Sequence, residues 1–456
     1  MSKDRSSLLL SEPNLYKSFI FLSLPIFGAN FLRALNDMVD TYFIGQIADS
    51  VAAQAGISDA WPPLSILQSF QIGFGVAGVA IISQLLGANN KEKARDNAGL
   101  LFIIALFLGV LINIVTYLLA PFAMTLIGAE GATHVCAVEY LRIRSFEMLS
   151  FFIFGAFQAI RQAQGDTATP VFLSIVSIVL NIILTALFVR GMDMGAFGAG
   201  LATMLGQVAV TPICLWLLFS KKQSLHLTRE SLKVRRKEAV NMCVVAMPAA
   251  GSQALSSLGF LVLQIIVVSY GDEVTAAFSI GNKIASMLLM PVFALGSVLA
   301  AYVGQNIGAG NPDRAKKACS VSRNLGLIIS IAGCLILLPF REWLVTLLTN
   351  DPTTQSFAVV YVFWTLLTQP LMALFQNYLG IFNGSGKTNY AMIMSSARLW
   401  IIRLPLILAF KLLTDIGPGG IWYAMVISNF LILLVGAWLY RKVDFQPHIL
   451  NKSKTI

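Results

Sequence analysis

The stretch QLLGANNKEKAR at residues 84–95 returns in the second half of the chain as QNIGAGNPDRAK at residues 305–316. Both copies have Gln, Gly, Ala, Asn and Ala at the same positions, and both carry charged residues in their second half. Glycine and asparagine favour tight turns, and charged side chains anchor helix ends at a membrane surface. We therefore expect two structurally equivalent loops on the same side of a membrane.

Two more pairs of segments repeat in the same way. QGDT at residues 164–167 matches SGKT at residues 385–388, with the same offset along the chain as the first pair. The prolines of LPIF (24–27) and MPAA (247–250) keep nearly that offset. Three matches in the same order indicate that the chain contains two copies of one structural unit.

The composition of the chain is that of a polytopic membrane protein. Of its 456 residues, 57% are hydrophobic and 12% are charged, and the mean hydropathy is +0.75, whereas soluble proteins carry about 25% charged residues. Apolar runs of about 20 residues recur along the chain and do not alternate with period two, which favours membrane-spanning helices over barrel strands. We predict twelve helical spans, at residues 15–45, 52–84, 97–120, 136–160, 170–190, 196–219, 240–269, 275–304, 321–340, 356–382, 390–412 and 419–440.

The distribution of basic residues predicts the orientation. With the N-terminus in the cytoplasm, the cytoplasmic segments hold 23 of the 32 Lys and Arg residues, and the opposite loops hold only Arg190, Arg341 and Lys411. This asymmetry follows the positive-inside rule, so we expect both termini on the cytoplasmic side of the cell (inner) membrane. The net charge of +10 then reflects loops beside anionic lipid, and not nucleic-acid binding.

An even number of spans in each copy inserts both copies in the same orientation. We predict an all-α fold with two six-helix bundles, residues 1–220 and 238–456, joined by a basic cytoplasmic linker at 221–237. Parallel repeats are related by an axis along the membrane normal, and two bundles that rock around a cavity suit alternating access. Fold alone does not establish function, which depends on the side chains of a site.

Two glycine-rich segments match nucleotide-binding motifs only in part. GFGVAG (73–78) lies inside an apolar helical run and lacks the preceding strand of a dinucleotide site. In GIFNGSGKT (380–388), the first glycine is one residue too far from the GKT for a Walker A motif.

The five cysteines form no CxxC pair, and no catalytic triad or metal-ligand spacing is present. We expect no enzymatic activity, no metal, no cofactor and transport driven by an ion gradient.

The combination of these features resembles the multidrug and toxic compound extrusion (MATE) family. The resemblance rests on the twelve-span plan, PIF (25–27), DTYFIG (40–45), the paired loops and GDT (165–167), and it covers essentially the whole chain. It looks closest to the DinF-type branch. It implies a secondary active exporter of organic cations and amphipathic drugs that works as a monomer, with small molecules, protons and membrane lipid as its partners.

Ionisable residues at membrane depth are costly and mark candidate functional sites. Arg33, Asp37 and Asp40 of the first span lie at i,i+4 and i,i+3 spacing, so they share one helix flank. We expect Arg33 to neutralise Asp37 or, alternatively, to approach Asp40. A carboxylate among apolar helices takes up a proton more readily than one in water. We predict that Asp40 couples the transport of proton and substrate, and that Asp37 is the second candidate for this role. The alternative is that Asp40 only fixes helix packing by hydrogen bonds to Asn181 or Thr203.

The resemblance implies further members of this site. Relatives with an N-lobe site group the first-span aspartate with an asparagine and an aspartate of the fifth span and a threonine of the sixth; the matching positions are Asp40, Asn181, Thr185 and Thr203. Thr185 replaces an acid, which leaves one carboxylate, and hard cations prefer several charged oxygens. The seventh and tenth spans, which supply acids in other relatives, contain none. We therefore predict proton coupling, with sodium-coupled export as an alternative.

Flexible and aromatic side chains build cavities that adapt to varied substrates. Our candidate substrate contacts are Asp40, Phe154, Asn181 and Met287. Four other intramembrane ionisable residues receive no assigned role: Glu147, Lys283, Arg398 and Arg403. The three cations among them keep open a second function, a lipid-linked oligosaccharide flippase of the same superfamily, because such a cavity must accept a pyrophosphate.

Overall fold

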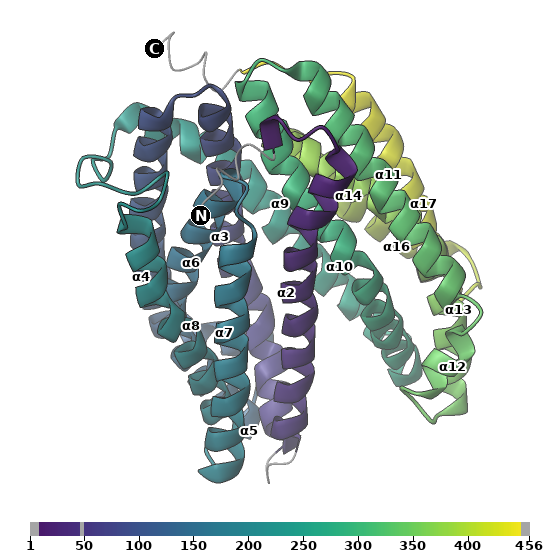
Figure 1. Cartoon of the computed structure of the whole chain (residues 1–456). Helices are drawn as coiled ribbons and strands as arrows, with labels where there is room; N and C mark the ends of the chain where they lie inside the picture. The colour runs from purple at the N-terminus through teal and green to yellow at the C-terminus, as the bar shows by residue number, and fades with distance from the viewer. Residues whose placement is uncertain (1–8, 46–49, 448–456) are drawn as a thin grey trace.

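A computed structural model describes residues 9–45 and 50–447, and all regular elements of this part of the chain are helical (Figure 1). The first half contains α2 (Leu15–Ile44), α3 (Ser50–Gly87), α4 (Lys91–Ile127), α5 (Gly131–Ser145), α6 (Glu147–Ala163), α7 (Ala168–Thr185), η1 (Ala186–Gly191) and α8 (Gly195–Phe219). The second half contains α9 (Arg236–Val268), α10 (Asp272–Gly308), α11 (Pro312–Leu337), α12 (Arg341–Thr346), α13 (Pro352–Leu367), α14 (Gln369–Gly384), α15 (Thr388–Ser396), η2 (Ala397–Arg403), α16 (Leu404–Leu413) and α17 (Gly419–Tyr440).

The twelve predicted spans are confirmed. Within residues 9–45 and 50–447, ten helical segments are each long and apolar enough to cross a membrane, and the total is twelve when each of the bent pairs α5–α6 and α13–α14 counts as one span. The observed and predicted ends of the spans differ by up to nine residues, the largest difference being the start of α11. The helix predicted at 97–120 begins at Lys91, because the side chain of Asn90 accepts a hydrogen bond from the backbone N–H of Lys93 (3.1 Å).

Irregular turns recur at related places in the two halves. The α5–α6 pair bends by 45° and the α13–α14 pair by 46°. Glu147 and Gln369, the first residues after each bend, are separated by nearly the same offset as the repeated loops. The fifth and eleventh spans each contain a π-helical segment, η1 and η2 respectively. Such segments widen the helix locally and are frequent at functional sites.

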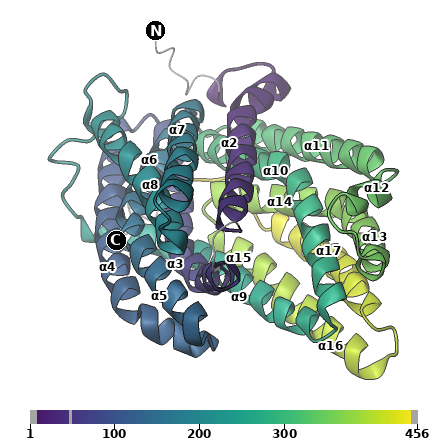
Figure 2. The ribbon, with the colours of Figure 1, turned by 90° about the horizontal axis from the view of Figure 1, so that it is seen from below.

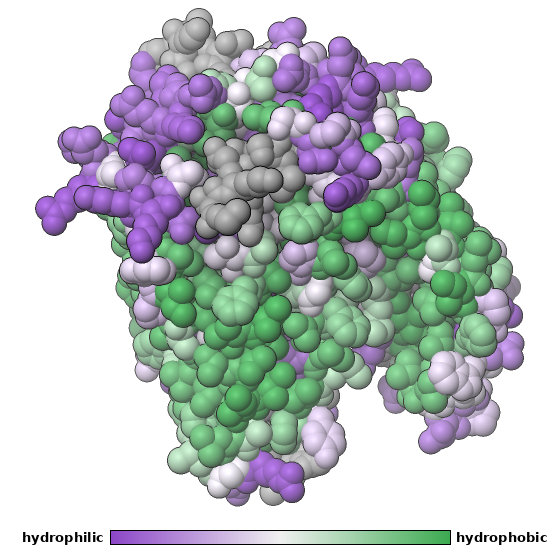
Figure 3. Space-filling model, in the orientation of Figure 1, coloured by the Kyte–Doolittle hydropathy of each residue, from purple (hydrophilic) through white to green (hydrophobic). Residues whose placement is uncertain are grey.

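The helices form two lobes, α2 to α8 and α9 to α17 (Figures 1 and 2). Between the lobes, α3 packs along α9, while α2 contacts both α7 of its own lobe and α10 of the other. The space-filling view shows a broad apolar surface below a hydrophilic upper side, and a hollow between the lobes at the lower end (Figure 3). We call the upper side, which carries the loops 88–90, 220–235 and 309–311, the basic side.

On the basic side the lobes touch through matched contacts. The Gln84 side chain donates a hydrogen bond from Nε2 to the carbonyl oxygen of Gly384 (3.3 Å), and Gln305 donates likewise to Ala163 (2.6 Å). Gln84 and Gln305 are equivalent positions of the repeat, as are Ala163 and Gly384. Each bond is therefore the repeat copy of the other. This confirms the parallel repeat and the equivalence of the two loops that follow these glutamines.

The QGDT and SGKT segments have one shared structural role. Thr167 Oγ1 donates to the carbonyl oxygen of Leu22 (2.9 Å), and Thr388 Oγ1 donates to that of Val245 (2.8 Å). Each threonine thus ties the start of the fifth or eleventh span to the first span of its own half. The repeated threonine is explained by this bond, which satisfies an equivalent carbonyl group in each lobe.

The first helix closes against the second lobe near the basic side. The Phe19 ring of α2 stacks on the Tyr302 ring of α10, with 4.5 Å between ring centroids and 10° between planes. The hydroxyl groups of Ser18 and Tyr302 are in contact beside this stack. All three side chains are buried. The contact joins α2 and α10 at the end of the molecule opposite the hollow.

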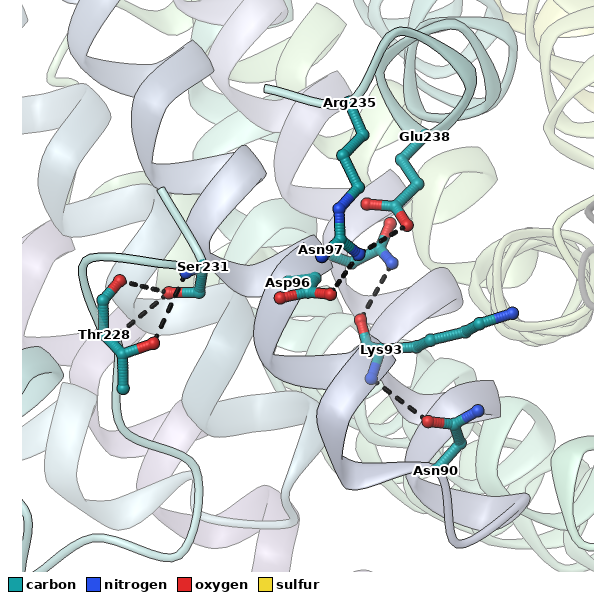
Figure 4. Close-up of polar contacts among 8 residues, drawn as sticks. All are labelled: Asn90, Lys93, Asp96, Asn97, Thr228, Ser231, Arg235 and Glu238. Carbon is teal, nitrogen blue, oxygen red and sulfur yellow. Dashed lines mark hydrogen bonds and ion pairs between the residues drawn. The ribbon is translucent and has the colours of Figure 1, made fainter. Parts of the chain in front are cut away.

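The segment between α8 and α9 packs against the first lobe (Figure 4). Its Leu225 and Leu227 side chains are buried in the main hydrophobic core. Arg235, immediately before α9, forms an ion pair with Asp96 of α4 and lies 3.5 Å from the Glu238 carboxylate. The linker is therefore a docked segment and not an extended tether.

Candidate functional site

Asp40 lies near the end of α2 and places its carboxylate against α7. Its Oδ1 accepts a hydrogen bond from Thr185 Oγ1 (3.0 Å), and its Oδ2 accepts one from Asn36 Nδ2 (3.2 Å). Both donors are neutral, and Asp40 forms no ion pair with any residue that the structure describes. The carboxylate is thus held in a fixed position without a counter-charge of its own.

Asn36 is a site residue that sequence reasoning missed. Its side chain is buried, and it reaches Asp40 from the preceding turn of the same helix. The signal was present in the i,i+4 spacing, which places two side chains of a helix side by side. The asparagine Oδ1 atom is buried without a hydrogen-bond partner.

The polar residues of α7 and α8 meet on the flank of α7 that carries Thr185. Asn181 Nδ2 donates to Thr203 Oγ1 (3.0 Å), and that hydroxyl donates to the carbonyl oxygen of Ala199 (2.9 Å). Asn181 and Thr185 occupy successive turns of α7, and both are buried. The structure thus brings together Asp40 with Thr185, and Asn181 with Thr203. The Oδ1 atom of Asn181 is buried and accepts no hydrogen bond from any described residue.

The backbone changes its geometry at this point. Thr185 is the last α-helical residue of its span, and the π-helical segment η1 follows directly. A π turn shifts the hydrogen-bonding register and rotates the following side chains relative to a regular helix. The hydroxyl that binds Asp40 therefore sits at the border of an irregular turn, where small rearrangements of α7 alter its position.

A buried ion pair lies near Asp40 at the bend between α5 and α6. Arg144 Nη1 lies 2.9 Å from Glu147 Oε2, and both side chains are less than a tenth exposed. The Arg144 guanidinium also lies 5.8 Å from the centroid of the Tyr140 ring, and its charge acts on Asp37 and Asp40. Glu147 had no predicted role; its i,i+3 spacing from Arg144 was the signal for this pair.

Arg33 and Asp37 lie on the exposed part of the same flank of α2. The charge of Arg33 acts on Asp37, as the i,i+4 spacing predicts. The hydrogen bonds of Asp40 come instead from Thr185 and Asn36. The two aspartates of α2 thus have different surroundings, one exposed beside an arginine and one fixed by neutral donors.

The predicted substrate contacts fall in both lobes. Phe154 of α6 is buried and lies 6.3 Å from the Phe157 ring. Met287 of α10 is 49% exposed. Their participation in substrate binding stays a prediction, as do the coupling roles of Asp40, Asp37, Asn181, Thr185 and Thr203.

The second lobe has a different set of polar groups. Arg398 and Arg403 of η2 are buried, whereas Lys283 of α10 is exposed. Arg403 donates from Nε to Ser428 Oγ (2.9 Å) and from Nη2 to Asn429 Oδ1 (2.7 Å). Both partners are neutral. The buried charge of the described second lobe is therefore basic, whereas the site of the first lobe is acidic.

The family of the chain follows from its similarity to known proteins. The MatE family model matches residues 25–187 and 248–408, one segment in each lobe. A probable multidrug resistance protein, YoeA of Bacillus subtilis, is 26% identical over 440 residues, which cover 94% of this chain and 95% of that protein. The probable multidrug resistance protein NorM of Thermotoga maritima is 26% identical over 444 residues, with the same two coverages.

Another relative has a name of a different kind, and solved structures share the fold. A protein of Shewanella oneidensis named FAD transporter is 26% identical over 454 residues, covering 97% of each chain. A structure described as the outward-facing conformation of a multidrug resistance MATE family transporter of the MOP superfamily matches with a TM-score of 0.90 at 21% identity, over 100% of both chains. The two segments that match the family model together span most of the chain, and the fold has the same two lobes as the solved transporters. This protein therefore belongs to the MatE family of membrane transporters.

Proposed function

We propose that this protein is a proton-coupled exporter of organic cations and amphipathic drugs. The observation that carries the proposal is the Asp40 carboxylate, which two neutral donors of α2 and α7 hold and which no described cation pairs with. Such a group can hold either a proton or a cationic substrate. The multidrug resistance names of two relatives support the substrate class.

The two lobes are proposed to alternate the access of this site. Residues 1–220 and 238–456 act as the moving units, and the docked segment 221–237 connects them. The lobes touch through Gln84 and Gln305 on the basic side, while the hollow lies at the opposite end (Figure 3). The excess of Lys and Arg on the basic side supports a cytoplasmic location for it and for both termini. The conformation described here is then open to the outside of the inner membrane.

Coupling arises because proton and substrate compete for one carboxylate. With the site open to the outside, a proton binds an Asp40 oxygen, the charge is lost and a cationic substrate departs. Thr185 can keep donating to the remaining acceptor oxygen, so the side chain holds its place in both protonation states. When the site faces the cytoplasm, the proton leaves and the carboxylate attracts the next cation. Mutually exclusive binding links the two fluxes.

A proton suits this site better than sodium does. The groups that hydrogen-bond to the Asp40 oxygens are the Thr185 hydroxyl and the Asn36 amide, while the Asp37 carboxylate acts on Asp40 through its charge and shares no hydrogen bond with it. Sodium coordination favours more than one charged oxygen, and the hydroxyl of Thr185 stands where relatives have an acid. One titratable carboxylate is sufficient for a proton.

Each chain contains a complete site, so we propose that the monomer is active.

Transport in proteoliposomes tests the function. The purified protein is reconstituted with a fluorescent lipophilic cation, and either a pH gradient or a sodium gradient is imposed. We expect uphill movement of the dye with the pH gradient alone; for one-to-one exchange, one pH unit supports about tenfold accumulation, because one unit corresponds to about 1.4 kcal/mol. Accumulation that requires sodium would establish the sodium-coupled alternative, and movement of neither kind would refute drug export.

A further inference from the structure

The second lobe buries two arginines at the depth of the membrane. Arg398 lies near the start of the η2 segment and Arg403 at its end, and the two residues are 7% and 5% exposed. Their charges lie close enough to act on each other. A buried guanidinium is unfavourable unless a counter-charge and hydrogen bonds compensate for its lost hydration. Two of them in one lobe therefore need an explanation.

No carboxylate of the described second lobe compensates for these charges. Ser428 and Asn429 bind Arg403, and both are neutral. The acidic residues of this half that follow the first turn of α9 all lie in loops or near helix ends: Asp272, Glu273, Asp313, Glu342, Asp351, Asp415 and Asp444. Neither arginine forms an ion pair with any of them.

Arg398 has the larger unused binding capacity. Its guanidinium lies 4.6 Å from the centroid of the Phe375 ring, and Nη1 lies 3.2 Å from the Met372 sulfur. A thioether is a weak acceptor. The Nε–H is buried without a hydrogen-bond partner. A guanidinium has five N–H donors in a planar fork that fits a carboxylate or a phosphate, so Arg398 presents a donor set suited to an anion.

The internal repeat shows that this polarity is a reversal of the first lobe. The repeat position equivalent to Arg398 is Ser177, an uncharged residue of α7. Conversely, the buried pair Arg144 and Glu147 corresponds to Thr365 and Thr368 of the second lobe, where the Thr368 hydroxyl donates to the Thr365 carbonyl oxygen. Among the described residues, buried acids thus belong to the interior of one lobe and uncompensated buried bases to the interior of the other.

We propose that the second lobe contains a binding site for an anionic group, a carboxylate or phosphate, of an amphipathic substrate. Arg398 contacts the anion through its fork, Phe375 holds that guanidinium in place, and Arg403 is fixed by Ser428 and Asn429 so that its charge adds to the field. The proposal rests on the proposed export function and extends its substrates from cations to molecules that carry an acidic group.

A pair of dyes that differ in one carboxylate tests this site. Rhodamine B carries a benzoate, and its ethyl ester has the same xanthene cation without that acid. Binding of each dye to the purified protein in lipid nanodiscs is measured by fluorescence anisotropy. We expect Arg398→Gln to weaken rhodamine B binding about tenfold, the value for loss of a hydrogen-bonded charge partner, and to change ester binding less than about twofold.

The controls separate anion binding from a packing role. Arg190→Gln removes an exposed arginine of the first lobe and should leave both dyes unaffected. An Arg398→Gln variant that weakens both dyes equally, or neither, overturns the proposal. If that variant does not fold, Arg398→Lys replaces it: retained charge without the fork should weaken rhodamine B alone, and an equal effect on both dyes is again contradictory.

Competition distinguishes the two kinds of anion. Octanoate and octyl phosphate are added separately to bound rhodamine B, and the more effective competitor identifies carboxylate or phosphate as the preferred group. Competition must disappear in Arg398→Gln; competition that persists in the variant overturns the assignment to this residue. These measurements report binding and do not depend on transport. If a pH gradient failed to drive transport of the ester, that result would refute the proposed function but would leave the anion site untouched.

Discussion

The contact between the lobes on the basic side depends on two glycines, and alanine at either should disrupt it. A Cβ on Gly87 would stand 2.8 Å from the carbonyl carbon of Gln305, and a Cβ on Gly308 would stand 2.7 Å from the carbonyl carbon of Gln84. Ordinary contact between carbon atoms requires about 3.5–4.0 Å. We predict that Gly87→Ala or Gly308→Ala drives the lobes apart on this side by about 1 Å or more.

The size of the effect follows from what the new methyl group meets. Both obstructing groups are backbone carbonyls, which cannot rotate away as a side chain can. Overpacking of this kind costs about 1–3 kcal/mol. Since about 1.4 kcal/mol is a factor of ten, the equilibrium between the closed and open basic side should shift about 5- to 150-fold towards the open state. Transport that requires closure on this side should fall accordingly.

The two substitutions should also interact. The two close approaches are repeat copies of each other, so separation of the lobes relieves both at once. We therefore expect the double variant to resemble either single variant, because nearby changes that share one structural response are not additive.

Distance measurement between the lobes provides the assay. Spin labels are attached at Glu92→Cys and Asp313→Cys, exposed positions that are equivalent in the repeat, in a background without the five native cysteines. Electron–electron dipolar spectroscopy should show a longer mean distance in Gly87→Ala. Gly326→Ala is the matched control, since a Cβ there meets only the Ala373 side chain at an ordinary 3.6 Å.

Unchanged behaviour would refute the reasoning. If Gly87→Ala and Gly308→Ala keep the wild-type distance distribution and transport rate, the close approach of the two loops does not govern closure. Loss of transport in Gly326→Ala to the same degree would show that the effect is a general response to helical alanine substitution.

The remaining predictions concern ion pairs and orientation. Arg144→Gln leaves the Glu147 carboxylate buried without its partner and should lower the free energy of unfolding by about 3–5 kcal/mol. Arg235→Gln removes a half-exposed arginine from its ion pair and should lower it by less than about 1 kcal/mol. Thermal unfolding of the purified variants compares the two losses, and equal losses would contradict the burial argument. An impermeant maleimide applied to intact cells should label Glu273→Cys but not the linker variant Glu230→Cys, and the reverse pattern would invert the proposed topology.

Much of the fold was predictable because its signals are local or repeated. A helix that crosses a membrane requires a continuous apolar run, so twelve spans were readable from hydropathy. The repeat was readable because Gln84 and Gln305, and likewise Thr167 and Thr388, make equivalent bonds in the two halves and are therefore the same residue types. The bends and π turns were not predicted, because neither leaves a consistent pattern in hydropathy.

The candidate site was predictable only in part. The set Asp40, Asn181, Thr185 and Thr203 followed from a family resemblance, since residues so far apart in the sequence have no local signature of contact. The pairing within the set was not predicted: Asp40 binds Thr185, and not Asn181 or Thr203 as the packing alternative expected. Asn36 was missed although its spacing to Asp40 is local, because a neutral amide in a membrane helix has many roles. The ion pair of Glu147 with Arg144 was likewise missed, although its i,i+3 spacing is local.

The central claim is that the Asp40 carboxylate couples export to protons, and one substitution tests it most directly. Asp40→Asn keeps the shape and one acceptor oxygen for Thr185 but cannot titrate. In proteoliposomes with a pH gradient, we predict that Asp40→Asn is folded and inserted yet accumulates no lipophilic cation, while Asp37→Asn, whose exposed side chain lies beside Arg33, retains accumulation. Full proton-driven accumulation by Asp40→Asn would contradict the account and assign the coupling to another acid.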